Sequence, residues 1–401
     1  MDMWKQSTAA RPAGIVGGRV TAAVGTQTAA NGSTLNEPWL RYSVNNLVIQ
    51  PTTLCNLDCT YCYLPFRDKN RRLPKVLAEK IANDLIELDT PVTVIWHGGE
   101  PLATGLEYFK TLVEPFEELR SSRRVEHVIQ TNATLITGGW CDLLKHYDFG
   151  VGISLDGPKH FNKNRLNLSG SESFDGVMAG VQLLKTHCID FSVIAVVNAL
   201  NIDAADELFS FFGELGCSSL GINIEEREGT NQKNYQGRER VEKFWNRLFE
   251  LWVAQPTFKI REFSRAISWM EAATKGEASF PKELRYDIFP TISVDGSVVM
   301  LAPELNGPYS TVRYPSFTVG NISDQSLKEI IARAQDVHYV KDYLKGVSNC
   351  RDSCEYFNFC LGGSASNKFF ECGDLTHTTT TYCENGQKAV VDAVLKCLEK
   401  I

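Results

Sequence analysis

The sequence lacks several features that define common classes of protein. It contains no run of about eighteen apolar residues, the length that a membrane-spanning helix needs, and no charged-then-apolar signal peptide at its N-terminus. It also lacks excess positive charge, since 41 Lys and Arg stand against 48 Asp and Glu, a net charge of −7. We therefore expect a cytoplasmic protein that binds neither membranes nor nucleic acids.

Cysteine, in contrast, is plentiful. The chain has 12 cysteines in 401 residues, and in a reducing compartment such a number favours metal ligation over disulfides. Three lie within residues 55–62 and five within residues 350–383. The four scattered cysteines fall in or near predicted helices, where we expect buried structural residues; they are Cys141, Cys188, Cys217 and Cys397.

The first cysteine group follows a short apolar run at residues 47–51 that predicts a buried strand. Its members, Cys55, Cys59 and Cys62, are separated by three and two residues and can converge on one metal cluster. A structural zinc site closes with four protein ligands, and an electron-carrying [4Fe–4S] cluster takes four cysteines, so three leave one iron open. A zinc site or a chance cluster of buried cysteines are the alternatives.

From Tyr42 to about Gly221 the pattern alternates strand and helix. It predicts strands at 45–50, 92–97, 125–131, 149–155, 190–197 and 219–224, and helices near 74–89, 106–120, 138–147, 173–187, 203–215 and 238–254. Six parallel strands with short connections are typical of a barrel-like βα repeat, although the same alternation could build an open doubly wound sheet. Residues 1–40, rich in Ala, Gly and Thr, predict a disordered extension.

Polar residues follow the ends of the predicted strands, where α/β folds carry their active sites. The second strand is followed by Gly98, Gly99 and Glu100, where glycine allows close approach of a ligand and the carboxylate can accept from an ammonium group. The later strands are followed by Asn132, by Ser154 and Asp156, and by Glu225 and Glu226. A turn-capping aspartate and a solvated charge run are the structural alternatives for the last two groups.

The second cysteine group contains Cys350, Cys354, Cys360, Cys372 and Cys383. It follows a predicted hairpin at residues 290–300, which turns at Asp295-Gly296, and a predicted helix from about Leu327. Four of these thiols could close one cluster or a zinc ribbon.

These motifs resemble the radical S-adenosylmethionine (SAM) superfamily, whose signature is three cysteines at these spacings with an aromatic residue, here Tyr61, before the third. The resemblance implies an α/β fold with a partial (β/α)6 TIM-like barrel over residues 41–285. It implies a [4Fe–4S] cluster on Cys55, Cys59 and Cys62 and cleavage of SAM to a 5′-deoxyadenosyl radical. The residues that it assigns to SAM binding are Tyr61, Gly98, Gly99, Glu100, Asn132, Ser154 and Arg165.

The C-terminal region, residues 286–401, resembles the SPASM extension of radical SAM peptide maturases, which normally holds two auxiliary [4Fe–4S] clusters. One ligand set survives as Cys350, Cys354, Cys360 and Cys383. The other is missing, because the hairpin has no cysteine and Ser364 stands where a ligand is expected. The resemblance therefore implies one auxiliary cluster, fully ligated by protein.

Among the maturases, residues 54–65, 223–226, 356–368 and 381–383 resemble the enzymes that form three-residue cyclophanes, including the glycine-rich repeat modification type. The implied reaction joins an aromatic ring carbon to the β-carbon of a nearby residue in a ribosomal precursor peptide with a leader. Flavodoxin or ferredoxin would donate electrons, and Asp156, Glu225 or Glu226 would accept the proton. The alternatives are thioether formation, epimerisation, formylglycine formation, or a non-catalytic metal-binding protein.

Overall fold

The core of the computed structural model, which describes residues 39–40, 43–235, 237–274 and 285–399, is a largely parallel sheet. Within these residues it has ten strands, in the order β12-β11-β10-β2-β3-β4-β5-β6-β7-β8. The predicted strands are present as β2 (Asn46–Ile49), β3 (Val92–Trp96), β4 (Val125–Thr131), β5 (Gly150–Ser154), β6 (Phe191–Val197) and β7 (Ser219–Ile224). Most of their residues are buried, as expected of parallel strands covered on both faces.

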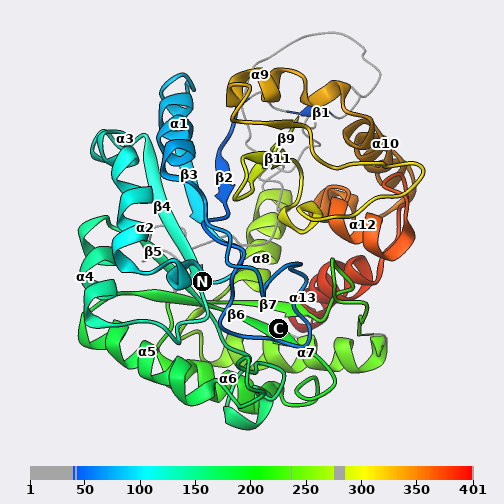
Figure 1. Cartoon of the computed structure of the whole chain (residues 1–401). Helices are drawn as coiled ribbons and strands as arrows, with labels where there is room; N and C mark the ends of the chain where they lie inside the picture. The colour runs from blue at the N-terminus through cyan, green and yellow to red at the C-terminus, as the bar shows by residue number, and fades with distance from the viewer. Residues whose placement is uncertain (1–38, 41–42, 236, 275–284, 400–401) are drawn as a thin grey trace.

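Helices connect successive parallel strands and form an arc around the outside of the sheet (Figure 1). They are α1 (Lys75–Ile86), α2 (Leu106–Val113), α3 (Glu117–Ser121), α4 (Gly138–His146), α5 (Phe174–Thr186), α6 (Ala205–Leu215) and α7 (Arg238–Ala254). Strands β2 to β7 stand in sequence order with no reversal, whereas a doubly wound sheet reverses at a switch point. The predicted α/β barrel is therefore confirmed.

The predicted helix at 106–120 is divided, which corrects the sequence analysis. Helix α2 ends at Val113, a 3-10 turn η2 (Glu114–Phe116) follows, and α3 begins at Glu117. Pro115 lies in this turn and has no N–H to donate to an α-helical hydrogen bond.

The C-terminal region continues the sheet of the barrel. After β8 (Lys259–Ile260), α8 (Arg261–Thr274) and β9 (Arg285–Tyr286), the predicted hairpin forms from β10 (Thr291–Ile292) and β11 (Ser297–Val299), and β12 (Gly320–Asn321) pairs with β11. Strand β10 runs parallel to β2, with Thr291 opposite Val48. The hairpin thus belongs to the same sheet as the barrel strands.

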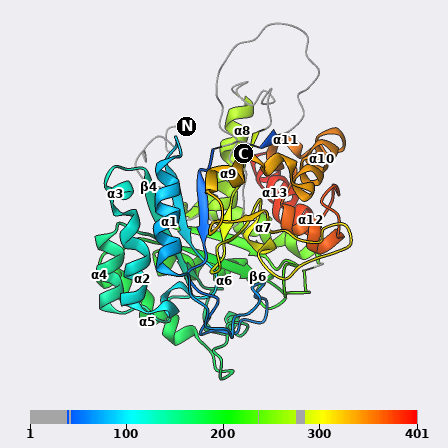
Figure 2. The ribbon, with the colours of Figure 1, turned by 45° about the horizontal axis from the view of Figure 1, so that its top comes forward.

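The remaining helices gather on the other side of β2 from α1 to α3, as both views show (Figures 1 and 2). They are α9 (Leu327–Ala332), α10 (His338–Ser353), α11 (Phe357–Cys360), α12 (Ala365–Cys372), the π-helical turn η6 (Cys383–Lys388) and α13 (Ala389–Leu398). Helix α13 packs on α7 and α8, which joins this region to the last helices of the barrel.

Two expectations need correction. Trp39–Leu40 form strand β1, which pairs parallel with β9, so the expected disordered extension over 1–40 is too long at its end; residues 1–38 lie outside the described residues. Cys141 and Cys217 are buried as predicted, whereas Cys397 is half-buried and Cys188 is exposed.

None of the helices in the described ranges has both the length and the apolar character to span a bilayer.

Candidate active site

A cavity of about 230 Å³ lies at the C-terminal ends of the parallel strands. From the barrel, its walls include Cys55, Cys59, Cys62, Tyr61, Gly99, Glu100, Asn132, Ser154, Arg165, Glu225 and Glu226. From the C-terminal region they include Glu304, Ser364, Ser366, Asn367 and Tyr382. The structure therefore brings most of the predicted site residues to one place. Asp156 and Gly98 do not line the cavity.

The loop after β2 carries the first cysteine group into this cavity. The Cys55 N–H donates to the Arg67 carbonyl at 2.9 Å, and the Cys55 sulfur accepts from the Leu57 N–H at 3.4 Å. Burial, and next Glu100, raise the pKa of the Cys55 thiol to about 12, and burial also raises the pKa of Cys59. A bound metal cluster would offset this cost, because a coordinating thiol is deprotonated by the metal's own charge.

The arrangement of thiols fits a cluster better than a zinc ion. Zinc holds each sulfur at about 2.3 Å from one point. Among the residues that the structure describes, no three His, Cys, Asp or Glu side chains are arranged to hold one metal ion. A four-iron cluster needs only thiols that surround a common space, because each thiolate binds a different iron. Cys55, Cys59 and Cys62 share the wall of one cavity and satisfy that condition.

Glu100 ties the ends of β3 and β4 together. Its Oε1 accepts from the Leu102 N–H at 3.0 Å and from the Thr131 hydroxyl at 2.6 Å, and its Oε2 accepts from the Asn132 N–H at 2.7 Å. The side chain is 2% exposed, and burial raises its pKa despite these donors. A carboxylate has about four acceptor positions, so roughly one is left for a ligand.

The glycines before Glu100 are required by the chain itself. Gly98 and Gly99 have φ of 105° and 63°, in the region that glycine enters without strain. A Cβ on Gly99 would lie 2.5 Å from the Thr52 carbonyl oxygen. The turn therefore packs directly beneath the segment that leads to the first cysteine group, and a side chain at residue 99 would push that segment away.

Tyr61 joins Asp156 to Arg165. The Tyr61 hydroxyl donates to Asp156 Oδ2 at 2.6 Å and accepts from Arg165 Nη1 at 2.8 Å. Asp156 Oδ1 accepts from the Val196 N–H at 3.0 Å, so its carboxyl is engaged behind the cavity wall. Arg165 lines the cavity and is 5% exposed, yet its Nε–H is buried and has no hydrogen-bond partner among the residues that the structure describes.

The Arg165 guanidinium is the feature that fits SAM. It lines the cavity, and a guanidinium is suited to bind a carboxylate there. Nearby, the Asn132 amide donates to Asn56 Oδ1 at 2.9 Å, and the Ser154 hydroxyl accepts from Gln130 at 3.0 Å. SAM carries a carboxylate and a ribose, for which these groups are suited.

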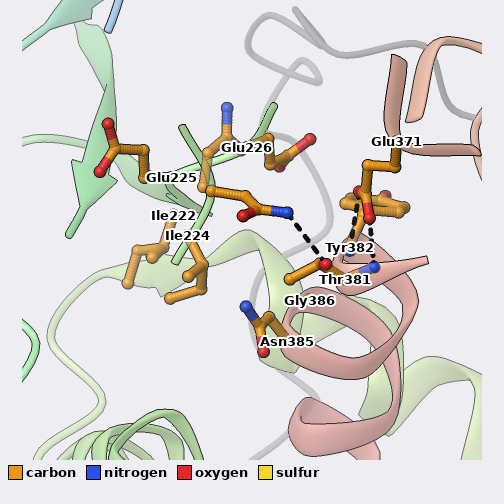
Figure 3. A pocket seen from close by; sticks show the side chains of 11 residues that line it. Ile222, Ile224, Glu225, Glu226, Glu371, Thr381, Tyr382, Asn385 and Gly386 are labelled. Atoms are coloured by element: carbon orange, nitrogen blue, oxygen red, sulfur yellow. Dashed lines mark hydrogen bonds between the residues drawn. The ribbon is translucent and has the colours of Figure 1, made fainter. Parts of the chain in front are cut away.

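Glu225 and Glu226 follow β7 and point in different directions (Figure 3). The Asn367 amide of α12 donates to Glu226 Oε2 at 2.9 Å. Glu225 is half-buried, and burial raises its pKa. Figure 3 also shows Glu371 turned toward Thr381 and Tyr382, whose backbone N–H groups donate to its carboxylate. Glu226 thus forms a direct link between the barrel and the C-terminal region.

Several cavity residues carry no sequence signal and are not predicted. The Tyr63 hydroxyl is 2.7 Å from His97 Nε2, and burial lowers the pKa of His97 to about 4, so this imidazole is neutral. Glu304 belongs to a 3-10 turn, η4 (Pro303–Leu305). Glu228 belongs to the same charge run after β7 as Glu225 and Glu226, which the sequence places at the mouth of the barrel. Both carboxyls line the cavity although the two segments are far apart in sequence.

The second cysteine group is assembled from helix ends. Cys350 and Cys354 end α10, Cys360 ends α11, and Cys383 begins η6. The Cys360 thiol donates to the Cys383 sulfur, and the Thr380 hydroxyl also donates to it, at 3.1 Å. These donors lower the pKa of Cys383 to about 6. The Cys372 thiol donates to the Thr379 carbonyl oxygen at 3.6 Å, and burial, Glu371 and then Cys383 raise its pKa.

A buried lysine faces this group. Lys368 is 1% exposed, and its Nζ lies 3.6 Å from Cys350 Sγ and 5.8 Å from the centre of the Tyr343 ring. Burying a cation is costly unless negative charge compensates it. Thiolates bound to an iron–sulfur cluster would supply that charge, so Lys368 fits a cluster at this place.

A parallel barrel with three cysteines open to a cavity is the arrangement of one class of enzyme, and comparison with known families agrees. The family model described as the radical SAM superfamily matches residues 49–212, and the chain belongs to this superfamily. SAM and a [4Fe–4S] cluster, the cofactors expected from the sequence, are those of the superfamily.

Three known proteins illustrate the similarity. Uncharacterized protein sll1766 of Synechocystis sp. is 35% identical over 377 residues, which cover 89% of this chain and 92% of that protein. A serine-type anaerobic sulfatase-maturating enzyme of Bacteroides thetaiotaomicron is 28% identical, with 82% of this chain and 84% of that protein covered. The solved structure of native anSMEcpe with bound AdoMet and Cp18Cys peptide shares the fold, with a TM-score of 0.71, 23% identity, and coverage of 90% and 98%.

Proposed function

We propose that the protein modifies a ribosomal precursor peptide by joining an aromatic ring carbon to the β-carbon of a nearby residue. The observation that carries this proposal is the shared cavity. Its walls hold the first cysteine group on one side and Ser366, Asn367 and Tyr382, from the region of the second cysteine group, on the other. A substrate bound there lies between a site of hydrogen-atom abstraction and a site of electron uptake.

We assign residues to each cofactor from the sequence resemblance, and their contacts support the assignment. Cys55, Cys59 and Cys62 hold the first cluster, and Cys350, Cys354, Cys360 and Cys383 hold one auxiliary cluster. When bound, SAM and the two clusters supply hydrogen-atom abstraction and electron transfer. Arg165 orients the SAM carboxylate through its guanidinium, and Tyr61 and Asp156 hold that arginine in place.

A peptide substrate is supported by the relatives. One is a sulfatase-maturating enzyme, and the similar solved structure contains a peptide. The cross-link is supported by the residues around Glu225 and around Cys360 that resemble cyclophane-forming enzymes. We place the reaction in the cytoplasm, with a flavodoxin or ferredoxin as electron donor and a leader segment on the precursor.

A second candidate is the oxidation of Ser or Cys to formylglycine. It is favoured by the 28% identity with a serine-type sulfatase-maturating enzyme over 82% of this chain. Both reactions use the same first step, removal of a β-hydrogen, and both then release one electron and one proton. They differ in whether the second partner is a ring carbon or the residue's own oxygen or sulfur.

Co-expression with test peptides separates the two. One peptide carries repeated aromatic-x-x-polar motifs, and the other carries a single Ser and no aromatic residue. We expect the aromatic peptide to lose two hydrogens, to show no aldehyde with a hydrazide reagent, and to resist fragmentation between the joined residues in tandem mass spectrometry. Aldehyde formation on the serine peptide, with the aromatic peptide unchanged, would overturn the cross-link in favour of formylglycine.

A further inference from the structure

Two acidic side chains with no assigned role, Glu228 and Glu304, lie on the wall of the cavity nearest the C-terminal region. Glu304 is 8% exposed, and Glu228 is half-buried because one edge faces the cavity. The Ser366 hydroxyl donates to Glu228 Oε1 at 2.6 Å. Both acids share the cavity wall with Ser364, and Glu304 follows the hairpin; these are the two places where the SPASM resemblance expects ligands of a second auxiliary cluster.

Glu228 is held firmly by the loop that carries it. Its N–H donates to the Asn231 carbonyl at 3.1 Å, and the Asn231 N–H donates back at 2.9 Å, which closes a tight turn. Gly229, at φ 56°, packs so closely on the loop of the first cysteine group that a Cβ would lie 2.1 Å from the Tyr63 carbonyl oxygen. The Tyr309 hydroxyl donates to the same oxygen at 3.2 Å. The carboxyl therefore has a fixed position relative to the cluster loop.

The surroundings keep one proton on the pair near neutral pH. Burial raises the pKa of Glu304 to about 7, and burial together with Glu304 raises that of Glu228 well above its usual range. Two buried carboxyls close together cannot both ionise easily. The other titratable groups that bear on the pair or on its tyrosine neighbours are Glu226, Glu371, Tyr63, Tyr309 and Cys62.

The proposed reaction needs a carboxylate that can accept a proton in the cavity. The role inferred for the two acids therefore rests on the proposed function. After the β-carbon radical of the peptide adds to the ring, the product forms when one electron passes to an oxidised iron–sulfur acceptor and one proton leaves the ring carbon. The C–H bond breaks, and its electron pair restores the aromatic ring. Formylglycine formation releases the same electron and a hydroxyl or thiol proton, so either reaction requires a base in the cavity.

We propose that Glu304, paired with Glu228, accepts this proton. Two of the three acids predicted from the sequence are less suited. Asp156 is engaged by Tyr61 and Val196 and does not line the cavity, and Glu226 accepts from Asn367. Glu304 lines the same cavity as the first cysteine group, so the ring or hydroxyl of a peptide bound there can lie near both.

The kinetic test is Glu304→Gln in the holoenzyme, assayed with the aromatic-x-x-polar peptide. We expect 5′-deoxyadenosine formation within about threefold of wild type and product at least a hundredfold lower, since general base catalysis contributes roughly that factor. A radical on the peptide should accumulate and be visible by electron paramagnetic resonance. Glu126→Gln, the same change at an exposed position of β4, should leave both rates unchanged.

A role of Glu304 in binding the peptide would give a different result. Glu304→Gln would then lower 5′-deoxyadenosine and product by the same factor, or weaken peptide binding as much as it lowers product. Either result would show that Glu304 binds substrate and that the proposal is wrong. Equal product from variant and wild type also overturns it. If wild type modifies neither test peptide, the proposed function fails instead, and the next measurement judges the acid pair separately.

That measurement is the pH dependence of thermal unfolding of the protein without cofactors. A carboxyl whose pKa is raised on folding keeps its proton in the folded chain after the unfolded chain has released it. The stabilisation of the folded chain by this bound proton is complete below the ordinary pKa of 4.5 and is lost as pH rises through about 7. We expect Glu304→Gln to raise the melting temperature relative to wild type more at pH 8 than at pH 5. A difference that does not change with pH would show that the two carboxyls do not share a proton.

Discussion

The two cysteine groups occupy opposite kinds of environment. The first lies in a loop, and all three of its thiols face the cavity. The four thiols of the second are at helix ends, two of them are buried, and none lines the cavity. The first has the Glu100 carboxylate near Cys55 and the Arg165 guanidinium near Cys59, and the second is backed by a buried lysine. Three open thiols suit a cluster that binds a substrate, and four enclosed thiols suit one that only carries electrons.

The strongest test of this contrast removes the first group. We expect reconstituted wild type to hold about eight irons and eight sulfides, from two four-iron clusters. Changing Cys55, Cys59 and Cys62 together to Ala should remove about half of the iron and all SAM cleavage, measured as 5′-deoxyadenosine by liquid chromatography. SAM cleavage by the triple variant would show that the open cluster lies elsewhere.

The second test removes one ligand of the enclosed group. Cys383→Ala should lose the auxiliary cluster and most product while it still forms 5′-deoxyadenosine, because the Cys383 sulfur accepts a hydrogen bond from the thiol of Cys360, another assigned ligand. Cys372→Ser is the matched control, since its sulfur contacts the Thr379 carbonyl instead. Loss of iron in the control but not in Cys383→Ala would reverse the ligand assignment, and full product without the cluster would remove its redox role.

The third test concerns the walls of the open site. Glu100→Gln places an amide N–H where a carboxylate oxygen accepts from a backbone donor, so one hydrogen bond becomes a clash. We expect SAM affinity to fall about ten- to a hundredfold and the free energy of unfolding to fall by about 1–3 kcal/mol. Calorimetry measures both, with Glu87→Gln on the exposed end of α1 as control. Weaker SAM binding with unchanged stability would mean that the three observed donors contribute little.

The smallest effect is expected at the enclosed group. Lys368→Met removes a positive charge near the auxiliary cluster. Loss of this charge stabilises the oxidised form of the cluster. Its reduction potential should fall by on the order of 50 mV at unchanged iron content, because charges a few ångströms apart interact by a few kcal/mol at most in this setting. Lys345→Met, on an exposed position of α10, is the control. An unchanged reduction potential would show that the charge of Lys368 does not act on the cluster.

What could be predicted from the sequence was mostly local. Strand and helix periodicities, the spacing of Cys55, Cys59 and Cys62, and the Asp295-Gly296 turn are each carried by a few adjacent residues. The division of the helix could also have been predicted, from the presence of Pro115. Glu304, its proximity to Glu228 and the Tyr63–His97 contact could not be predicted, because each depends on segments that only the folded chain brings together. The filled acceptor positions of Glu100 and Asp156 depend in the same way on the alignment of neighbouring strands.

The pairing of β10 with β2 has a consequence for any shortened form of the protein. The Val48 N–H donates to the Pro290 carbonyl at 3.0 Å, and the Gln50 N–H donates to the Ile292 carbonyl at 2.9 Å. A chain cut before residue 286 would leave these backbone groups on an uncovered edge, which is a template for pairing with other chains. The strand that delivers the first cysteine group would then promote aggregation, so the barrel should be obtained in usable form only with its C-terminal region attached.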